Sequence, residues 1–126
     1  DREKATGIPP QTANFLQYIA QCDLIVTSMA ENNGNFSAAF KNLFDWSSRA
    51  ERFVFQEKPM LLMATSPGAR GGMSVLDIAQ TTFARFGAQI KATFSLPSFF
   101  DNFDVENQKI SNEKLDQQLK EIVQSL

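Results

Sequence analysis

The segment at residues 66–72, SPGARGG, is the part of the chain best suited to binding chemistry. It lies between the apolar run MLLMAT and a helical pattern, so it connects an expected strand to an expected helix. Glycine lacks a side chain, so backbone N–H groups in such a loop can approach a ligand closely. A plain strand-to-helix connection that uses glycine only for its backbone angles explains the same residues. The local pattern supports the two interpretations about equally.

Two other polar segments also follow expected strands. Residues 30–35, AENNGN, have the composition of a turn, and residues 95–103, SLPSFFDNF, end the last strand and continue beyond it. The first segment is also explained as an Asx-type turn that caps the next helix, which does not exclude ligand contact.

The composition indicates that a cofactor carries whatever chemistry these loops serve. The chain has no histidine, which excludes histidine-based catalytic triads and removes the commonest zinc ligand. Cys22 is the single cysteine, so the chain forms no internal disulfide, as is usual in a reducing compartment. The net charge of −2 and the pI of about 5.1 give no broad basic surface, so we expect no nucleic-acid partner.

Length and hydropathy limit the organisation further. The 126 residues, of which 43% are hydrophobic, suffice for one core, so we expect residues 1–126 to belong to a single domain. Twelve phenylalanines against one tyrosine and one tryptophan favour an aromatic core or interface. There is no signal-peptide pattern and no apolar run long enough to span a bilayer, so we expect a soluble cytoplasmic protein with no membrane partner.

Hydrophobic periodicity predicts alternating helices and strands around the three segments. Residues 1–7 are charged and loop-like, and residues 97–110 are expected to be a surface excursion. Strand 23–29 is apolar on both faces, as in a buried parallel strand, whereas strand 89–96 alternates apolar and polar residues, as at a sheet edge. In order, the expected elements are a helix entered at Pro9 and Pro10, strand 23–29, helix 36–47, strand 60–65, helix 75–86 ended by Gly87, strand 89–96, and a C-terminal helix with Ser111 as its N-cap.

This order of elements predicts an α/β fold with a parallel sheet and helices on its faces. In such sheets ligands sit beyond the carboxyl ends of the strands. Three segments follow or end expected strands: residues 30–35, 66–72 and 95–103. They are therefore expected to lie together at the carboxyl ends of the strands.

Two long motifs in this region resemble those of a known family. They are AENNGNFSAAFKNLFDW at residues 30–46 and KPMLLMATSPGARGG at residues 58–72, and they are similar to the NADPH-dependent FMN reductase family of quinone, azo and metal-ion reductases. The usual family form of the first motif is Pro-Glu-Tyr-Asn-Gly, followed by a helix containing Leu-Lys-Asn-Ala-Leu-Asp-Trp. The resemblance extends over essentially the whole chain. The matching residues of the first motif are Glu31, Asn33, Gly34, Lys41, Asn42, Asp45 and Trp46.

The resemblance implies a flavodoxin-like three-layer α/β/α fold, here its C-terminal part with three strands and four helices. It also implies that FMN binds along the first two loops, mostly through backbone groups, with NAD(P)H as co-substrate. The chain departs from the family motif at Ala30, which replaces proline, and at Asn32, which replaces a tyrosine beside the flavin ring. The residues implied to bind the cofactor are Ala30, Glu31, Asn32, Asn33, Gly34, Thr65, Ser66, Pro67, Gly68 and Ala69.

The function implied by the resemblance is an FMN-dependent NAD(P)H oxidoreductase, which passes electrons on to a quinone, an azo compound, a free flavin or a metal ion. No side chain is expected to act as a catalytic base, because the cofactor carries the chemistry. The family's chain begins with a strand and a Gly-Ser-rich loop that grips the FMN phosphate, and no such loop occurs here, so we expect this chain to be the C-terminal part of a longer domain. The alternative function is a non-enzymatic flavodoxin-like electron carrier or a flavin-free interaction domain.

Charged residues near the motifs have more than one interpretation. Arg70 has two interpretations: it faces the 2′-phosphate of NADPH, or it lies in solvent or in an interface. The second interpretation is favoured. By resemblance, Glu31 lies beside the flavin ring or across a subunit contact. Lys41 and Asp45 are four residues apart and are placed to pair on one helix face. The acidic residues within 97–110 lack the spacing of a calcium loop, so no metal site is expected.

Some aromatic residues favour contact with a second subunit. In the family, the helix at 36–47 often lies in a dimer interface, so we expect a homodimer or homotetramer. The residues of this helix that suit an interface are Phe40, Phe44 and Trp46. Three phenylalanines of the last loop either fold back over the mouth of the site or bury against a partner subunit, which is slightly favoured: Phe99, Phe100 and Phe103.

Overall fold

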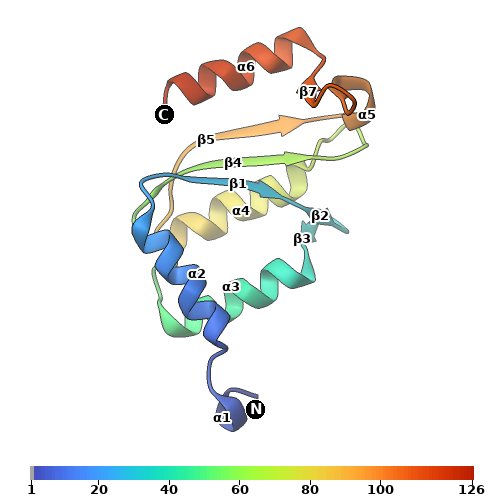
Figure 1. The fold of residues 1–126 in the computed structure, drawn as a ribbon. Helices are drawn as coiled ribbons and strands as arrows, with labels where there is room; N and C mark the ends of the chain where they lie inside the picture. The colour runs from blue at the N-terminus through green and yellow to red at the C-terminus, as the bar shows by residue number, and fades with distance from the viewer. Residues whose placement is uncertain (1) are drawn as a thin grey trace.

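A computed structural model describes residues 2–126 (Figure 1). Its longer elements alternate between helix and strand, as the periodicity predicts, and short hairpins and short helices are added to them. In chain order the elements are α1 (Arg2–Thr6), α2 (Pro10–Gln21), β1 (Ile25–Met29), β2 (Glu31–Asn32), β3 (Asn35–Phe36), α3 (Ala38–Ala50), β4 (Pro59–Thr65), α4 (Met73–Arg85), β5 (Gln89–Leu96), α5 (Phe99–Asn102), β6 (Phe103–Asp104), β7 (Lys109–Ile110) and α6 (Glu113–Gln124).

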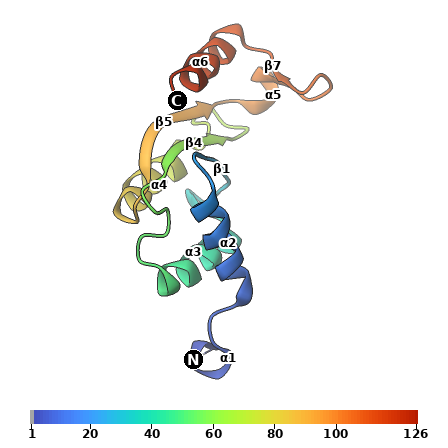
Figure 2. The same ribbon diagram turned by 60° about the vertical axis from the view of Figure 1, so that its left-hand side comes forward.

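Strands β1, β4 and β5 form the main sheet in that spatial order, and both pairings are parallel. Helices α2, α3 and α4 lie on one side of this sheet and α6 lies on the other (Figures 1 and 2). The predicted α/β fold, with a parallel sheet and helices on its faces, is therefore confirmed. No helix within residues 2–126 is long and apolar enough to cross a membrane.

Strand β4 lies at the centre of the sheet, and β1 lies at one side of it. Met60 and Leu62 of β4 have no exposed surface, which confirms the expected burial of this strand. The prediction that strand 23–29 is buried on both faces is wrong, because Val26 and Ser28, which lie on one face of β1, are exposed. An apolar run identifies a strand of a sheet, but it does not identify the neighbours that cover it.

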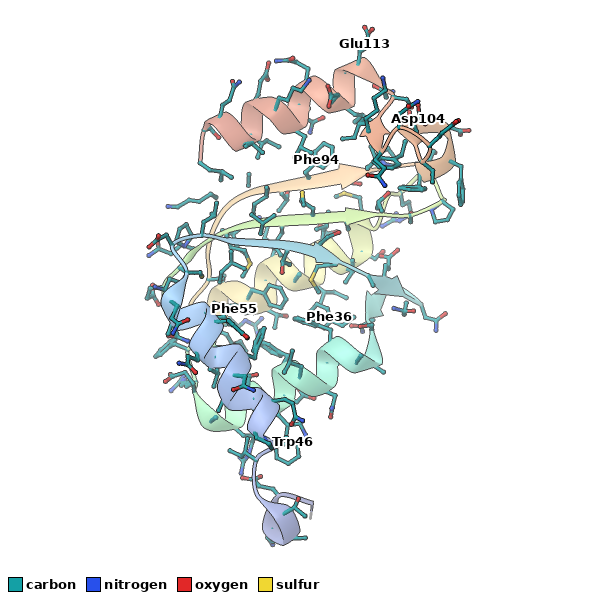
Figure 3. The ribbon with its side chains drawn as sticks, viewed as in Figure 1. Phe36, Trp46, Phe55, Phe94, Asp104 and Glu113 are labelled. Atoms are coloured by element: carbon teal, nitrogen blue, oxygen red, sulfur yellow. The ribbon has the colours of Figure 1, made fainter. Side chains whose placement is uncertain are left out.

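An aromatic cluster around Phe83 fills the space between the sheet and its helices. Phe83 is fully buried, and its ring centroid lies 4.7 Å from that of Phe55 and 5.6 to 5.7 Å from those of Phe36, Phe40 and Phe44. Such ring pairs add to the stabilisation that burial alone provides. Figure 3 shows Phe36 and Phe55 on this side of the sheet. Phe44 is therefore buried in the core rather than at a dimer interface, and the partly buried Phe40 packs against the same core.

Strand β5 lies at the opposite edge of the sheet from β1, as predicted, but its apolar residues do not share one face. Ile90 pairs with Met60 and packs against the aromatic core. A β-bulge follows, so that Ala92 rather than Lys91 pairs with Leu61. The apolar residues after the bulge therefore face α6, as Phe94 does in Figure 3, and the predicted strict alternation is wrong at this point.

Three helix boundaries also differ from the prediction. Helix α1 forms where a loop was expected, and Glu3 in it accepts hydrogen bonds from the Arg49 guanidinium of α3. Helix α3 starts later than residue 36 because the preceding residues pair in a hairpin, and Ser37 is its N-cap. The N-cap of α6 is Asn112 rather than Ser111, since the Asn112 side chain accepts a backbone N–H of the first turn.

Phe83→Ala tests the position of the aromatic cluster. This change is expected to lower the free energy of unfolding by about 3–5 kcal/mol, because it removes a buried ring and leaves a cavity. Phe100→Ala is the matched control: Phe100 is 74% exposed, so its loss is expected to stay within about 0.5 kcal/mol. Urea denaturation measures both values, and equal losses in the two variants would contradict the central position of Phe83.

Candidate functional site

The hairpin after β1 is the first of three segments that meet at the carboxyl ends of the strands (Figure 1). Glu31 pairs with Phe36 and Asn32 pairs with Asn35, so β2 and β3 are joined by a two-residue turn. Its residues Asn33 and Gly34 have φ values of 51° and 76°, as the Asn-Gly sequence of such turns favours. The Asx-type helix cap considered for this segment does not form, because the Ser37 side chain caps α3.

The Glu31 side chain connects this hairpin to helix α4. Its carboxylate accepts the backbone N–H of Val75 in the first turn of α4 at 2.9 Å. The N-cap of α4 is Gly72, which has no side chain to accept an N–H there, so Glu31 supplies the cap from a distant part of the chain. The negative charge is also favourable at a helix N-terminus. The structure thus gives the Glu31 carboxylate an intramolecular partner.

Two glycines of the loop at 66–72 are required by the fold. Gly71 and Gly72 have φ values of 58° and 79°, which favour glycine. A Cβ at Gly71 would lie 2.9 Å from Pro97 Cα, and a Cβ at Gly72 would lie 2.7 Å from Ala64 Cβ. Both glycines therefore serve the turn and the packing of α4 against the sheet, as one of the two sequence interpretations has it.

Gly68 differs from the other two glycines. Its φ is not positive, and a Cβ there would meet Ser66 Oγ alone, at 3.9 Å, which is ordinary van der Waals contact. Neither backbone angle nor packing within the chain thus requires glycine at this position. Within residues 2–126, the N–H groups of Gly68 and Ala69 have no hydrogen-bond acceptor. The loop therefore presents open space and free donors at this point.

The segment after β5 holds the loop at 66–72 from its other side. The N–H of Ser98 donates to Gly68 O at 2.9 Å, and the N–H of Phe99 donates to Ser66 O at 3.0 Å. The Ser95 hydroxyl donates to Gly71 O at 2.8 Å. The sequence did not identify Ser95 and Ser98 as residues that bind the loop at 66–72. The available signal was their position near the end of a strand with alternating residues.

Thr65 also ties the ends of β4 and β5 together, because its hydroxyl donates to Leu96 O at 2.7 Å. A hollow of about 220 Å³ lies on the α6 side of these strand ends. Phe99 and Phe103 line it and stack with their ring centroids 5.0 Å apart, so these two fold back onto the strand ends. Phe100 points to solvent instead.

A larger hollow of about 680 Å³ lies at the opposite, amino-terminal ends of the strands, where Asp23, Pro59 and Leu126 line it. It contains no residue of the three converging segments, so it is not part of this candidate site. The three converging loops, and not this hollow, therefore form the candidate site.

Arg70, Lys41 and Asp45 are exposed charged groups near the loops. Arg70 Nη2 donates to the Ser74 hydroxyl at 3.3 Å, and Lys41 pairs with Asp45 at 2.8 Å, as predicted for these helix neighbours. Hydrogen bonds from the side chain and backbone of Asn107 lower the pKa of Asp104, the last residue of β6. Among residues 2–126, no group of three or more His, Cys, Asp or Glu side chains is placed to hold a metal ion.

Glu31→Ala is expected to lower the free energy of unfolding by about 1 kcal/mol, because it removes the cap of α4. Glu31→Gln keeps an acceptor but loses the charge, so a smaller loss, on the order of 0.3–1 kcal/mol, is expected. Asn32→Ala, in the exposed neighbour on the same hairpin, is the control and should change stability by less than about 0.5 kcal/mol. Thermal and urea denaturation give the values, and a Glu31→Ala protein as stable as the control would contradict the capping role.

Gly72→Ala is expected to destabilise the protein by about 1–3 kcal/mol, because the left-handed backbone and the close Ala64 Cβ both oppose a side chain. Gly68→Ala is the matched control and should stay within about 0.5 kcal/mol of the wild type. The same denaturation measurements apply. A Gly68→Ala loss as large as that of Gly72→Ala would show that the fold itself requires the glycine at 68.

Known proteins share this fold. The FerB flavoenzyme NAD(P)H:(acceptor) oxidoreductase from Paracoccus denitrificans superposes on this chain with a TM-score of 0.73 at 19% sequence identity, over 98% of this chain and 71% of that one. This likeness supports the flavodoxin-like fold that the motifs imply.

The family follows from the sequence. An NAD(P)H-dependent FMN reductase of Pseudomonas aeruginosa is 31% identical over 67 residues, which are 53% of this chain and 36% of that relative. The chain therefore spans little more than a third of this relative's length. The sequence profile of NADPH-dependent FMN reductases matches residues 1–101, which include the hairpin and the loop at 66–72. The chain thus belongs to the NADPH-dependent FMN reductase family.

Proposed function

We propose that this protein is an FMN-dependent NAD(P)H oxidoreductase. In this proposal NAD(P)H is the electron donor, and the acceptor is a small molecule such as a quinone, an azo compound, a free flavin or a metal ion. The observation that carries the proposal is the adjacency of the segments at 30–34 and 65–69, which follow the paired residues Met29 and Ala64 at the carboxyl ends of parallel strands, in a chain of this family.

The loop at 65–69 has the properties needed to hold the edge of a flavin ring. The space at Gly68 lets a planar ring approach the backbone, and the N–H groups of Gly68 and Ala69 are free among the described residues. These neutral donors suit the carbonyl oxygens of a flavin. They also stabilise negative charge on the reduced ring, because fixed dipoles act strongly where water is excluded.

The β2–β3 hairpin would line the ring from another side. Asn32 and Asn33 are exposed at its tip, so their amides are free to face a ligand. At Asn32 an amide stands in place of the family's aromatic ring, so this side of the site offers hydrogen bonds instead of stacking. FMN, when bound, supplies the hydride-accepting chemistry, and no side chain of the chain is then required as a base.

Absorbance spectroscopy of the purified protein with added FMN tests this function. Bound FMN is expected to show a flavin spectrum shifted from that of free FMN, and NADPH oxidation should accelerate when a quinone is added. A colourless protein that takes up no FMN would contradict the proposed enzymatic function. A yellow protein that a partner protein reduces, but NADPH does not, would favour the electron carrier instead.

Gly68→Val refines the same test. The added side chain would occupy the space proposed for the ring, so FMN affinity is expected to fall at least about tenfold, on the order of 1.4 kcal/mol. Phe100→Ala, which changes an exposed ring on α5, is the control and should keep the wild-type affinity. Unchanged FMN affinity in Gly68→Val, with the variant folded, would contradict the placement of the ring at this loop.

A further inference from the structure

We propose that Ser98 is a positioning residue, whose backbone fixes the direction of the Gly68–Ala69 peptide so that the Ala69 N–H faces the flavin. This inference rests on the proposed function, because it assigns a role within the same site. It starts from the hydrogen bonds that Ser98 and its neighbours make to the loop at 66–72.

The direction of the Ala69 N–H follows from the geometry of one peptide unit. Gly68 O accepts two hydrogen bonds, from the N–H of Ser98 at 2.9 Å and from the N–H of Gly71 at 3.2 Å. In a trans peptide the C=O and the following N–H point in opposite directions. The Ala69 N–H therefore points away from Ser98 and Gly71, and it has no acceptor among residues 2–126. The segment after β5 thus orients a donor that the chain itself does not use.

The Ser98 backbone is held in a conformation that few residues other than glycine adopt. Its φ and ψ are 46° and 61°, in the left-handed region, where a side chain raises the energy. Within the described residues the Ser98 hydroxyl makes no hydrogen bond, so the backbone of this residue and not its side chain contacts the loop. Strain of this kind persists where the surrounding contacts determine the conformation.

Those contacts lead from the loop to helix α6. The Asn102 side chain donates to Pro97 O at 2.7 Å, next to Ser98, and the N–H groups of Asp101 and Asn102 donate to Ser98 O. Asn102 in turn accepts a hydrogen bond from the side chain of Asn112, the N-cap of α6, at 3.1 Å. The direction of the Ala69 N–H is therefore fixed by a chain of bonds that ends at a helix terminus.

A fixed donor affects the reduced flavin more than the oxidised flavin. A hydrogen bond to a charged acceptor is worth more than one to a neutral acceptor. Loss of the orientation of the Ala69 N–H should thus weaken binding of both forms, and the anionic reduced form most. This difference in affinity is a property that a merely structural role of Ser98 would not change selectively.

The test compares two substitutions at Ser98. Ser98→Pro removes the N–H and requires a φ of about −65°, so it leaves Gly68 O with the longer bond from Gly71 alone and loosens the Gly68–Ala69 peptide. Ser98→Gly keeps the N–H and tolerates the left-handed conformation, so it is the conservative variant that should restore wild-type behaviour. Ser95→Ala is a milder second variant, since it removes the bond to Gly71 O without altering the backbone. Circular dichroism and thermal denaturation establish that each protein is folded.

Two readouts are needed, of which one is independent of turnover. In ¹⁵N-resolved NMR spectra, the Ala69 amide resonance of the wild type and of Ser98→Gly should shift when FMN is added. FMN affinity should fall about three- to tenfold in Ser98→Pro and less in Ser95→Ala. A loss ten times larger for the reduced form than for the oxidised form would lower the two-electron potential by about 30 mV.

The outcomes separate this inference from the proposed function. If the wild type binds FMN but the Ala69 resonance does not move, or if folded Ser98→Pro binds both redox forms as tightly as the wild type, the positioning role is overturned and the flavin site stands. If Ser98→Gly loses affinity as Ser98→Pro does, the backbone argument is overturned as well. If the wild type takes up no FMN, the proposed function fails, and this inference fails with it.

Discussion

Parallel pairing of β4 with a strand on each side is the constraint on which the rest of this structure depends. Because β1, β4 and β5 run in the same direction, the segments that follow them all start at the carboxyl ends of the strands. β4 is central, so the loop at 66–72 has a neighbour on both sides. With β4 at an edge, the same loop would have one neighbour, and the donors at Gly68 and Ala69 would lie on an unsupported connection.

The two neighbours hold this loop and its helix by different physical means. On the hairpin side a charged side chain, Glu31, caps α4, and its contribution depends on the helix dipole as well as on the hydrogen bond. On the β5 side the bonds come mainly from backbone N–H groups and one hydroxyl, which carry no charge. The side toward Ser98 is therefore insensitive to salt, whereas the hairpin side responds to salt through the charge of Glu31. Gly71 and Gly72 let the sheet and the loop approach closely enough for both sets of contacts.

The sequence predicted the parts of this structure that depend on local pattern, and it missed those that depend on tertiary partners. Hydrophobic period and turn composition were sufficient for the alternating elements and for the meeting of the loops at one edge. They could not show that Val26 is exposed, because the exposure of a strand's face depends on which elements pack against that face. The bulge after Ile90 has no local signature, so the apolar residues of β5 were placed on one face. Likewise, Glu31 was assigned by family resemblance alone, since its partner, Val75, is far along the chain.

Ser98 illustrates why the missing parts concern the site in particular. A serine in a left-handed conformation contradicts local propensity, at a cost of about 1–3 kcal/mol, and such conflicts are expected where a function is served. The cost is sustained because Asn102 and the cap of α6 fix the segment from outside the loop. Gly68 shows the complementary case, since no contact among residues 2–126 requires its lack of a side chain. Contacts with neighbouring residues therefore account for the strained backbone of Ser98. No such contact accounts for the glycine at position 68, whose carbonyl Ser98 binds. This combination is what a preorganised backbone donor beside an open ligand position requires.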